Sequence, residues 1–170
     1  MSPVFTKSQV AFATLGAVIA VSALSYLAAT TQALLLLGSF GASTLLLFAL
    51  PEAPLSQPRA VIGGHLIASL VALSCLAVFG PQWWAVGAAT GLAVGLMMLT
   101  RTVHPPAGSN GIIVFLAKPG WSLLLFSTLV GTVTLVVLAM IYHRATRRHR
   151  YPRYWRLAPA EPTPLPGTAA

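Results

Sequence analysis

The chain has 170 residues, of which 56% are hydrophobic and 7% charged, and its ten lysines and arginines outweigh two acids to give a net charge of +8. With a mean hydropathy of +0.82, this composition excludes an ordinary soluble domain, in which about 25% of residues are charged. Several continuous apolar runs approach the roughly 20 residues that a membrane-crossing helix needs. Because these runs do not alternate with polar residues as barrel strands do, the sequence predicts an all-α, polytopic membrane helix bundle.

The apolar runs predict about five transmembrane helices, over residues 9–29, 32–50, 60–79, 83–100 and 121–143. The first run is about 20 residues long, which exceeds the hydrophobic core of a signal peptide, and a second run follows almost at once. We therefore interpret it as a first span that is not cleaved. Very short links precede the second and fourth spans, so each should form a tight antiparallel hairpin with the span before it.

Small residues gather in the second and fourth spans. The second contains GSFGAS at residues 38–43, and the fourth repeats glycine every four residues along one helical face. Such faces let helices approach closely, so we predict helix packing at Gly38, Gly41, Gly87, Gly91 and Gly95. For the second span, contact of its hydroxyls with a solute is an alternative. Because five helices enclose little volume, a transport path is expected to need a homo-oligomer formed through the fourth-span glycine face.

The first dense polar patch reads PEAPLSQPRAVIGGH over residues 51–65. Gln57 and Arg59 precede the start of a helix, and His65 lies within its first turns. An ionisable residue inside a span is costly enough to suggest a function, although this argument weakens near the interface. The alternatives are an arginine that snorkels to lipid headgroups and a packed histidine that bonds a neighbouring carbonyl.

A second polar patch, RTVHPPAGSNG at residues 101–111, opens on the same face of the five-span bundle. Two consecutive prolines remove backbone donors and disfavour helical geometry in the residue before them, so one helix should stop near His104 and another begin. Ser109 and Asn110 are good capping residues, and the free amides of a helix start attract anions. Arg101 and His104 add one fixed and one pH-dependent positive charge. The patch predicts an anion-contacting turn, and the alternative is a simple proline-rich connection.

About ten helix-compatible residues follow this turn, ending at residue 117, and they are too few to cross a bilayer. They predict a short helix that is either re-entrant or interfacial. Non-helical backbone at membrane depth is tolerated only inside protein or beside a water-filled cavity. If the turn lies inside the membrane, it should therefore be surrounded by protein or line a water-filled cavity.

The segment after the last span is first basic and then rich in proline. Six arginines fall between residues 144 and 156, and four prolines fall within residues 157–170. Basic segments beside a span stay in the cytoplasm and attract anionic lipid. We therefore expect a transmembrane domain over residues 1–143 and a largely disordered cytoplasmic tail over residues 144–170. Five spans would place the N-terminus outside, and a bacterial inner membrane is the expected location.

The scarcity of acids excludes several functions. The membrane portion holds one carboxylate, Glu52, so it cannot assemble paired carboxylates or a Ser-His-Asp triad, and two histidines are too few for a metal site. We predict no enzyme activity, metal or cofactor. We also predict no nucleic-acid partner, because no part of the sequence resembles a nucleic-acid-binding domain. The charge imbalance favours a small inorganic anion. Its candidate binding residues are Gln57, Arg59, His65, Arg101, His104, Pro105, Pro106, Gly108, Ser109 and Asn110.

Three motifs in this order resemble the HPP family of small integral membrane proteins. They are the GSFGAS run, the patch that ends at His65, and MMLTRTVHPPAGSNG, which contains the triplet His104, Pro105 and Pro106. The resemblance covers about residues 34–143. It implies about four membrane helices and a transporter function, with nitrite transport associated with some plastid and cyanobacterial members. We therefore expect an anion transporter or channel, with nitrite favoured. The alternative is a non-transporting membrane scaffold or a subunit of a larger membrane complex.

Overall fold

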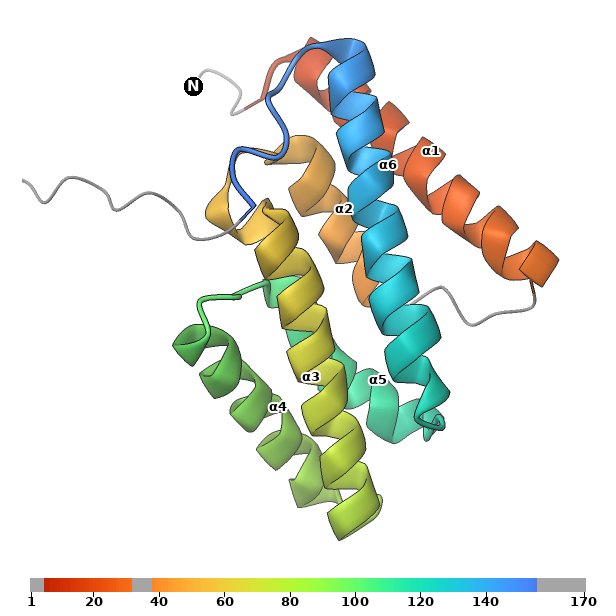
Figure 1. Ribbon diagram of the computed structural model, residues 1–170, viewed down its shortest axis with the longest axis vertical. Coiled ribbons are helices and arrows are strands. Elements are labelled where there is room, and N and C mark those ends of the chain that lie inside the picture. The colour runs from red at the N-terminus through yellow and green to blue at the C-terminus, as the bar shows by residue number, and fades with distance from the viewer. Residues whose placement is uncertain (1–4, 32–37, 156–170) are drawn as a thin grey trace, which may run out of the picture.

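The computed structural model describes residues 5–31 and 38–155, and in these ranges the chain forms helices and no strand (Figure 1). The predicted all-α class is therefore confirmed. In chain order the elements are α1 (Lys7–Thr31), α2 (Ser39–Ala49), the 3₁₀ turn η1 (Pro54–Ser56), α3 (Pro58–Phe79), α4 (Trp83–Leu99), the 3₁₀ helix η2 (Pro105–Ser109), α5 (Asn110–Ala117), the π-helix η3 (Leu124–Val130) and α6 (Gly131–Thr146).

The predicted count of five spans is wrong. Within the described ranges, three helices are long and apolar enough to cross a membrane: α1, α3 and the continuous helix of η3 and α6. The other two predicted spans contain α2, with 11 residues, and α4, with 17 residues, and residues 32–37 of the second predicted span lie outside the described residues. Both are apolar but shorter than the roughly 20 residues of a full crossing. Hydropathy marks both runs because their residues are apolar, whatever the length of the helix that they form.

The two ends of the described chain lie at the same end of the bundle. Helices α1, α3 and α5 run in one direction, and α2, α4 and α6 run in the other (Figure 1). The Tyr142 hydroxyl on α6 donates to the Phe12 carbonyl on α1 at 2.8 Å, and the Arg148 guanidinium lies 3.6 Å from the Phe12 ring centroid. The two ends of the described chain thus lie at one end of the bundle, whereas the five-span prediction places the N-terminus outside and the C-terminus in the cytoplasm.

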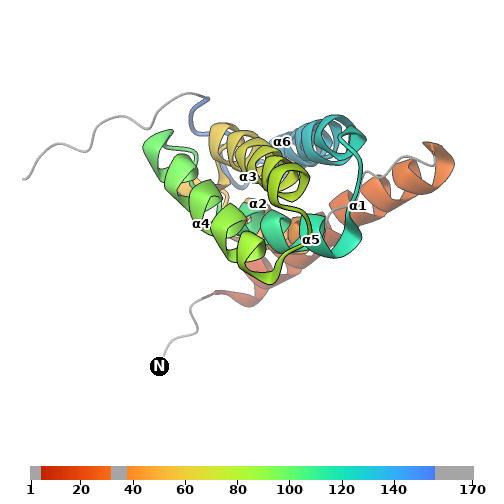
Figure 2. The ribbon, with the colours of Figure 1, turned by 90° about the horizontal axis from the view of Figure 1, so that it is seen from below.

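Helix α3 contacts α4, α5, η2 and η3, and it is the element on which the interior is built. Seen from below, α2 and α5 lie between the longer helices (Figure 2). The buried residues of α3 recur every three or four positions, as expected for one helical face. The first half of this face carries His65 and Ser69, whereas the half beyond Ser69 carries Ala72, Leu73 and Cys75. The interior is thus polar near the start of α3 and apolar near its end.

The proline turn interrupts the chain as predicted. Helix α4 ends at Leu99, and Pro105 and Pro106 open η2, from which α5 continues for eight residues. His104 is extended, with φ of −137° and ψ of 97°, which fits a residue that precedes proline. Helix α5 packs against α3 and α4, so it enters the bundle rather than lying on its surface.

Residues 147–155 fold back over the loop that leads into α3. The Tyr151 hydroxyl donates to the Ser56 carbonyl at 2.9 Å, and the Arg153 backbone N–H donates to the Gln57 Oε1 at 2.9 Å. Burial raises the pKa of the Tyr151 phenol, so this group stays protonated and able to donate. These contacts hold residues 147–155 of the tail against the bundle. Residues 156–170 of the predicted disordered tail lie outside the described residues.

The glycines predicted to pack helices together do not lie in close contact with neighbouring helices. A methyl group added at Gly41, Gly87, Gly91 or Gly95 would meet nothing within 4 Å, and at Gly38 it would be 3.7 Å from Ile113 Cδ1. The fourth-span glycine face therefore points away from the rest of the chain, and the predicted oligomer contact through it stays a prediction. A four-residue repeat identifies a flat face but not what lies opposite.

A close approach of two chain segments occurs where residues 102–104 cross α3. A methyl group at Gly64 would lie 2.8 Å from His104 Cβ and 2.9 Å from the Thr102 carbonyl oxygen, and at Gly63 it would lie 2.8 Å from Thr102 Cγ2. A methyl group at Gly64 would therefore displace the Thr102 backbone, and one at Gly63 would displace the Thr102 side chain. Glycine at these two positions lets the His104 segment lie directly against α3.

We expect Gly64→Ala to destabilise the protein by about 1–3 kcal/mol, because the added methyl overpacks a backbone contact. For a chain of this size, this loss lowers the thermal unfolding midpoint in detergent by roughly 2–10 °C. Gly91→Ala is the matched control, since it adds the same methyl to a helix facing open space. The control should leave the midpoint unchanged or raise it, and equal losses in both variants would contradict the packing assignment.

Candidate functional site

Six buried polar side chains meet in the centre of the bundle, and we refer to them as the polar cluster. Each is at most 1% exposed. They come from five parts of the chain, namely α2, α3, the segment before η2, α5 and η3. The members of the polar cluster are Ser43, His65, Ser69, His104, Asn110 and Thr128. A group of this size in an apolar interior requires internal hydrogen bonds, because an unpaired polar group there is costly.

Local sequence explains how each side chain reaches the cluster. His65 and Ser69 are four residues apart on α3, so both project from its buried face. Asn110 begins α5 immediately after the proline turn. Thr128 lies in η3, where the chain forms a π-helix over seven residues, a geometry often found at functional sites.

The polar cluster is linked by a continuous series of hydrogen bonds. Ser43 Oγ lies 3.0 Å from His65 Nε2 and 2.9 Å from His104 Nε2, so one hydroxyl bridges two imidazoles. Asn110 Nδ2 lies 3.2 Å from His65 Nδ1 and donates to Ser69 Oγ at 2.8 Å. Thr128 donates to Ser69 Oγ at 2.9 Å. The series therefore runs from His104 through His65 to the π-helix.

The partners fix which ring nitrogens carry hydrogen. His104 Nδ1 lies 2.8 Å from the Leu55 carbonyl oxygen, which can only accept, so Nδ1 donates and Nε2 of the neutral ring accepts. Ser43 must then donate to His104 Nε2 and accept from His65 Nε2. His65 Nδ1 in turn accepts from the Asn110 amide. Every hydrogen bond of the two rings thus has one donor and one acceptor.

Four buried polar atoms have no hydrogen-bond partner among the described residues, and one of them, Asn110 Oδ1, belongs to the cluster. The other three are Ser39 Oγ, Thr90 Oγ1 and Ser127 Oγ. Ser39 is one helical turn before Ser43, and Ser127 precedes Thr128. Thr90 Oγ1 would lie 2.6 Å from a methyl group at Gly111, next to Asn110. Three of these four atoms are hydroxyls, which can donate to a bound solute.

The predicted site residues divide into two groups. The structure brings His65, His104 and Asn110 together inside the cluster. It leaves both arginines outside: Arg59 and Arg101 are exposed, and Arg59 Nη2 donates to the Thr100 carbonyl at 2.8 Å. Arg59 is the second residue of α3, and Arg101 follows the end of α4. At both positions the charge remains in contact with water or headgroups.

The remaining predicted residues shape the turn around the cluster. Gln57 is fully buried, but its amide donates to the carbonyls of Pro51 and Ala53, both at 3.0 Å, and so it holds the loop before α3. Ser109 donates to the Pro106 carbonyl at 2.8 Å. Pro106 is buried, Pro105 is exposed, and Gly108 and Ser109 are half-buried. Within the described ranges, none of these residues forms a hydrogen bond with either histidine, and the bonds of Gln57 and Ser109 hold the backbone of the two loops.

Ser69 and Thr128 were missed by the sequence reading. Ser69 could have been found from its four-residue spacing after His65, which places both on one helical face. The hydroxyls of Ser127 and Thr128 interrupt an apolar run, but a serine or threonine in a membrane helix commonly bonds its own backbone and gives a weak signal. Ser43 was included only as part of the GSFGAS run.

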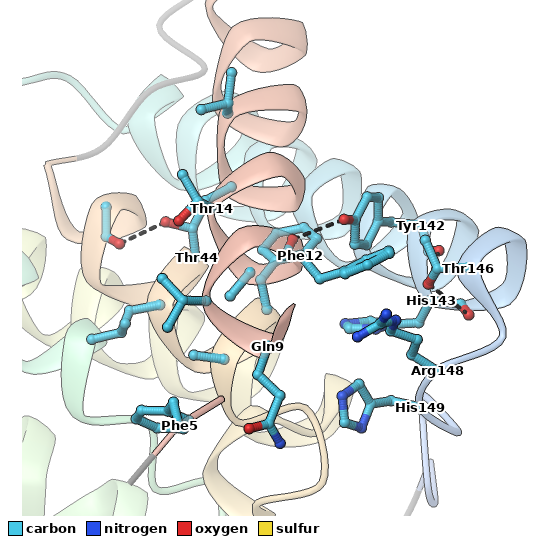
Figure 3. Close-up of a pocket in the computed structure, with 18 residues that line it drawn as sticks. Phe5, Gln9, Phe12, Thr14, Thr44, Tyr142, His143, Thr146, Arg148 and His149 are labelled. Atoms are coloured by element: carbon cyan, nitrogen blue, oxygen red, sulfur yellow. Dashed lines mark hydrogen bonds between the residues drawn. The ribbon is translucent and has the colours of Figure 1, made fainter. Parts of the chain in front are cut away.

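A separate cavity of about 420 Å³ lies on the opposite face of α2, between α1, α2 and α6 (Figure 3). Its walls are mainly apolar, and Gln9, Arg148 and His149 lie at one end. Thr44 and Phe48 of α2 line this cavity, whereas Ser43 faces the polar cluster. The cavity contains no member of the cluster, and its apolar walls do not suit a small ion.

Comparison with known proteins gives one family match and two relatives. The family model described as "HPP, transmembrane region" matches residues 2–152. Two transmembrane proteins of Dictyostelium discoideum are each 29% identical over 132 residues, which is 73% of this chain and 42% and 46% of theirs. This chain thus spans less than half the length of these relatives. No solved structure matches.

We expect Ser43→Ala to destabilise the fold by about 1–3 kcal/mol, because it leaves ring nitrogens of two buried histidines without a partner. Ser39→Ala is the matched control: it lies one turn earlier on the same helix, is also buried, and removes a hydroxyl without a partner. Thermal unfolding in detergent should show a lower midpoint for Ser43→Ala and an unchanged or higher midpoint for Ser39→Ala. If Ser43→Ala were neutral, the bridging role of its hydroxyl would be refuted.

Proposed function

Because the chain belongs to the HPP transmembrane family and is an integral membrane protein, we propose that it is a transporter or channel for a small inorganic anion, with nitrite as the favoured substrate. The observation that carries this proposal is the polar cluster. It gathers imidazole, hydroxyl and amide groups in the interior of an apolar bundle, and no carboxylate belongs to it.

The chemistry of the cluster suits an anion. An anion that leaves water needs N–H and O–H donors to replace its hydration, and bonds from neutral donors to a charged acceptor are stronger than neutral pairs. The hydroxyls of Ser39, Thr90 and Ser127 have no partner among the described residues and can supply such donors. Glu52, the one acid in the described ranges, pairs with His149 and Arg153 at the end of the bundle. It therefore does not repel an anion from the interior.

The two arginines then attract the anion without holding it. Arg59 and Arg101 are exposed, and they precede His65 and His104 in the same two segments of the chain. Exposed positive charges raise the local concentration of anions and their rate of arrival, and salt screens this effect. Because neither arginine lies inside the cluster, no fixed positive charge holds the anion there, and it can leave quickly, as transport requires.

Passage requires the cluster to open, because each of its members is at most 1% exposed. The residues that close it toward the start of α3 belong to the loops at residues 51–57 and 101–104, and those beyond Ser69 are apolar. We propose that the His104 segment and α5 move relative to α3, since contacts to these elements complete the cluster. The basic tail favours a cytoplasmic C-terminus, and the N-terminal end of α1 lies on the same side.

The test is uptake of nitrite, with nitrate and chloride for comparison, into liposomes that contain the purified protein. Wild-type protein should move one anion above the level of empty liposomes. His104→Gln should reduce this uptake at least tenfold, because the variant breaks the hydrogen bonds to both Ser43 and Leu55. Circular dichroism and size-exclusion chromatography must show that the variant is folded.

Arg101→Gln should slow uptake about two- to fivefold at low salt and have no effect near 0.5 M salt, because its charge acts through screened attraction. Arg150→Gln is the control, since this exposed tail arginine makes no hydrogen bond or ion pair within the described ranges. If the wild type moves no anion above empty liposomes, the proposal is wrong, and a scaffold or subunit role becomes the better account. If the Arg101→Gln and Arg150→Gln variants behave alike, the Arg101 charge does not attract the anion to the cluster more than any other exposed arginine does.

A further inference from the structure

The Ser43 hydroxyl has more neighbours than one hydrogen atom can serve. Its oxygen lies 2.9 Å from His104 Nε2, 3.0 Å from His65 Nε2 and 3.2 Å from the Ser39 carbonyl oxygen of its own helix. A hydroxyl has one hydrogen to donate and two lone pairs to accept with. Two arrangements of hydrogen atoms therefore fit the same heavy-atom positions, and they differ by one proton.

In the neutral arrangement, Ser43 donates to His104 Nε2 and accepts from His65 Nε2. The Ser39 carbonyl then lacks the hydrogen of Ser43, although it keeps its place in the α2 backbone. His104 donates only through Nδ1, to the Leu55 carbonyl. Both rings are uncharged, and each ring nitrogen has a matched partner.

In the second arrangement, one proton from water binds the lone pair of His104 Nε2. The Ser43 hydroxyl first rotates, so that its hydrogen points to the Ser39 carbonyl, and its oxygen then accepts from both His104 Nε2 and His65 Nε2. His104 becomes an imidazolium that donates at both nitrogens, to Leu55 and to Ser43. No bond between heavy atoms breaks and no side chain has to move, and the only net change is one added proton and one positive charge.

A second proton has no equivalent place. It would have to bind His65 Nδ1, which already accepts from the Asn110 amide at 3.2 Å. Two imidazolium rings would also lie 5.1 Å apart, measured between ring centroids, and would repel each other. The geometry therefore accommodates one proton and disfavours two.

The groups around the two rings supply no charge that could balance this proton. Helix α2 presents Phe40 and Ser43, η1 its Leu55 carbonyl, α4 the Met97 sulfur, α5 Asn110 and η3 Thr128. None of these groups is titratable. Helix α6 carries the titratable side chain His143. This side chain bonds the Leu47 carbonyl at 2.9 Å and stacks on Phe48, and it makes no hydrogen bond to either ring of the site. Arg59 and Arg101 are exposed at the end of the bundle.

We infer that Ser43, His65 and His104 form a binding site for a single proton, and that this proton is carried together with the anion as an electroneutral proton–anion symport. The inference rests on the proposed function and names the coupling ion. A buried imidazolium without a carboxylate is unstable on its own, whereas a monovalent anion in the same cluster neutralises it. Each ligand therefore increases the affinity for the other, as thermodynamic linkage requires.

The first test uses wild-type protein in liposomes, with nitrite as the probe, at pH 7 and above, where little nitrous acid crosses the bilayer unaided. With the outside more acidic by one pH unit, nitrite should accumulate about tenfold beyond the level in empty liposomes. An inside-positive potential of about 60 mV, set with potassium and valinomycin, should leave this accumulation unchanged. An uncoupled anion pathway would instead respond about tenfold to the potential and not to the pH difference. That result would overturn the symport while leaving the anion-transport proposal intact.

The second test reads the proton directly. Wild-type protein labelled with ¹⁵N-histidine is titrated by NMR in detergent between pH 8 and pH 4, with and without nitrite, and His104→Gln assigns the His104 signals. The inference predicts that the His104 Nε2 signal changes from an acceptor to an N–H nitrogen, while His65 keeps one N–H, and that nitrite moves this change to higher pH. If both rings or neither ring took a proton while the protein stayed folded, the single-proton site would be refuted. This readout remains decisive even if no anion is transported.

Discussion

The bridge formed by Ser43 between His65 and His104 is the interaction on which the interior depends. In a bundle surrounded by lipid, a buried polar group cannot turn to water, so it must find its partner within the protein. Ser43 meets this requirement for two imidazoles at once and ties α2 to α3 and to the segment before η2. The start of α3 is therefore specified by hydrogen bonds, whereas its second half is packed by apolar side chains.

The bridge is possible only because the chain can bring His104 against α3. Glycine at positions 63 and 64 leaves room for the backbone of residues 102–104, and Pro105 favours the extended conformation of His104. Helix α5 then returns into the bundle and delivers Asn110 to the other side of His65. The HPP triplet thus acts together with the glycine pair of α3, since neither would place the imidazole without the other.

The sequence predicted the class of fold and the parts of the site that have strong local signals. Hydropathy marks apolar helices, and proline marks the turn, so His104, Asn110 and His65 were recognised as candidates. Hydropathy does not separate a full crossing from a shorter apolar helix, which is why α2 and α4 were counted as spans. Side-chain partners also depend on which helices become neighbours. For that reason the sequence grouped Arg59 and Arg101 with the histidines, whereas the structure places both arginines at the exposed end.

The central claim is that the polar cluster binds an anion, and the most direct measurement is the thermal stability of the detergent-purified protein as nitrite is added. A ligand that binds only the folded state raises the unfolding midpoint with concentration, by an amount set by its affinity. The account predicts a rise that saturates in the wild type, persists in Arg150→Gln and disappears in a folded His104→Gln variant. An absence of any rise in the wild type, or an equal rise in all three proteins, would contradict it.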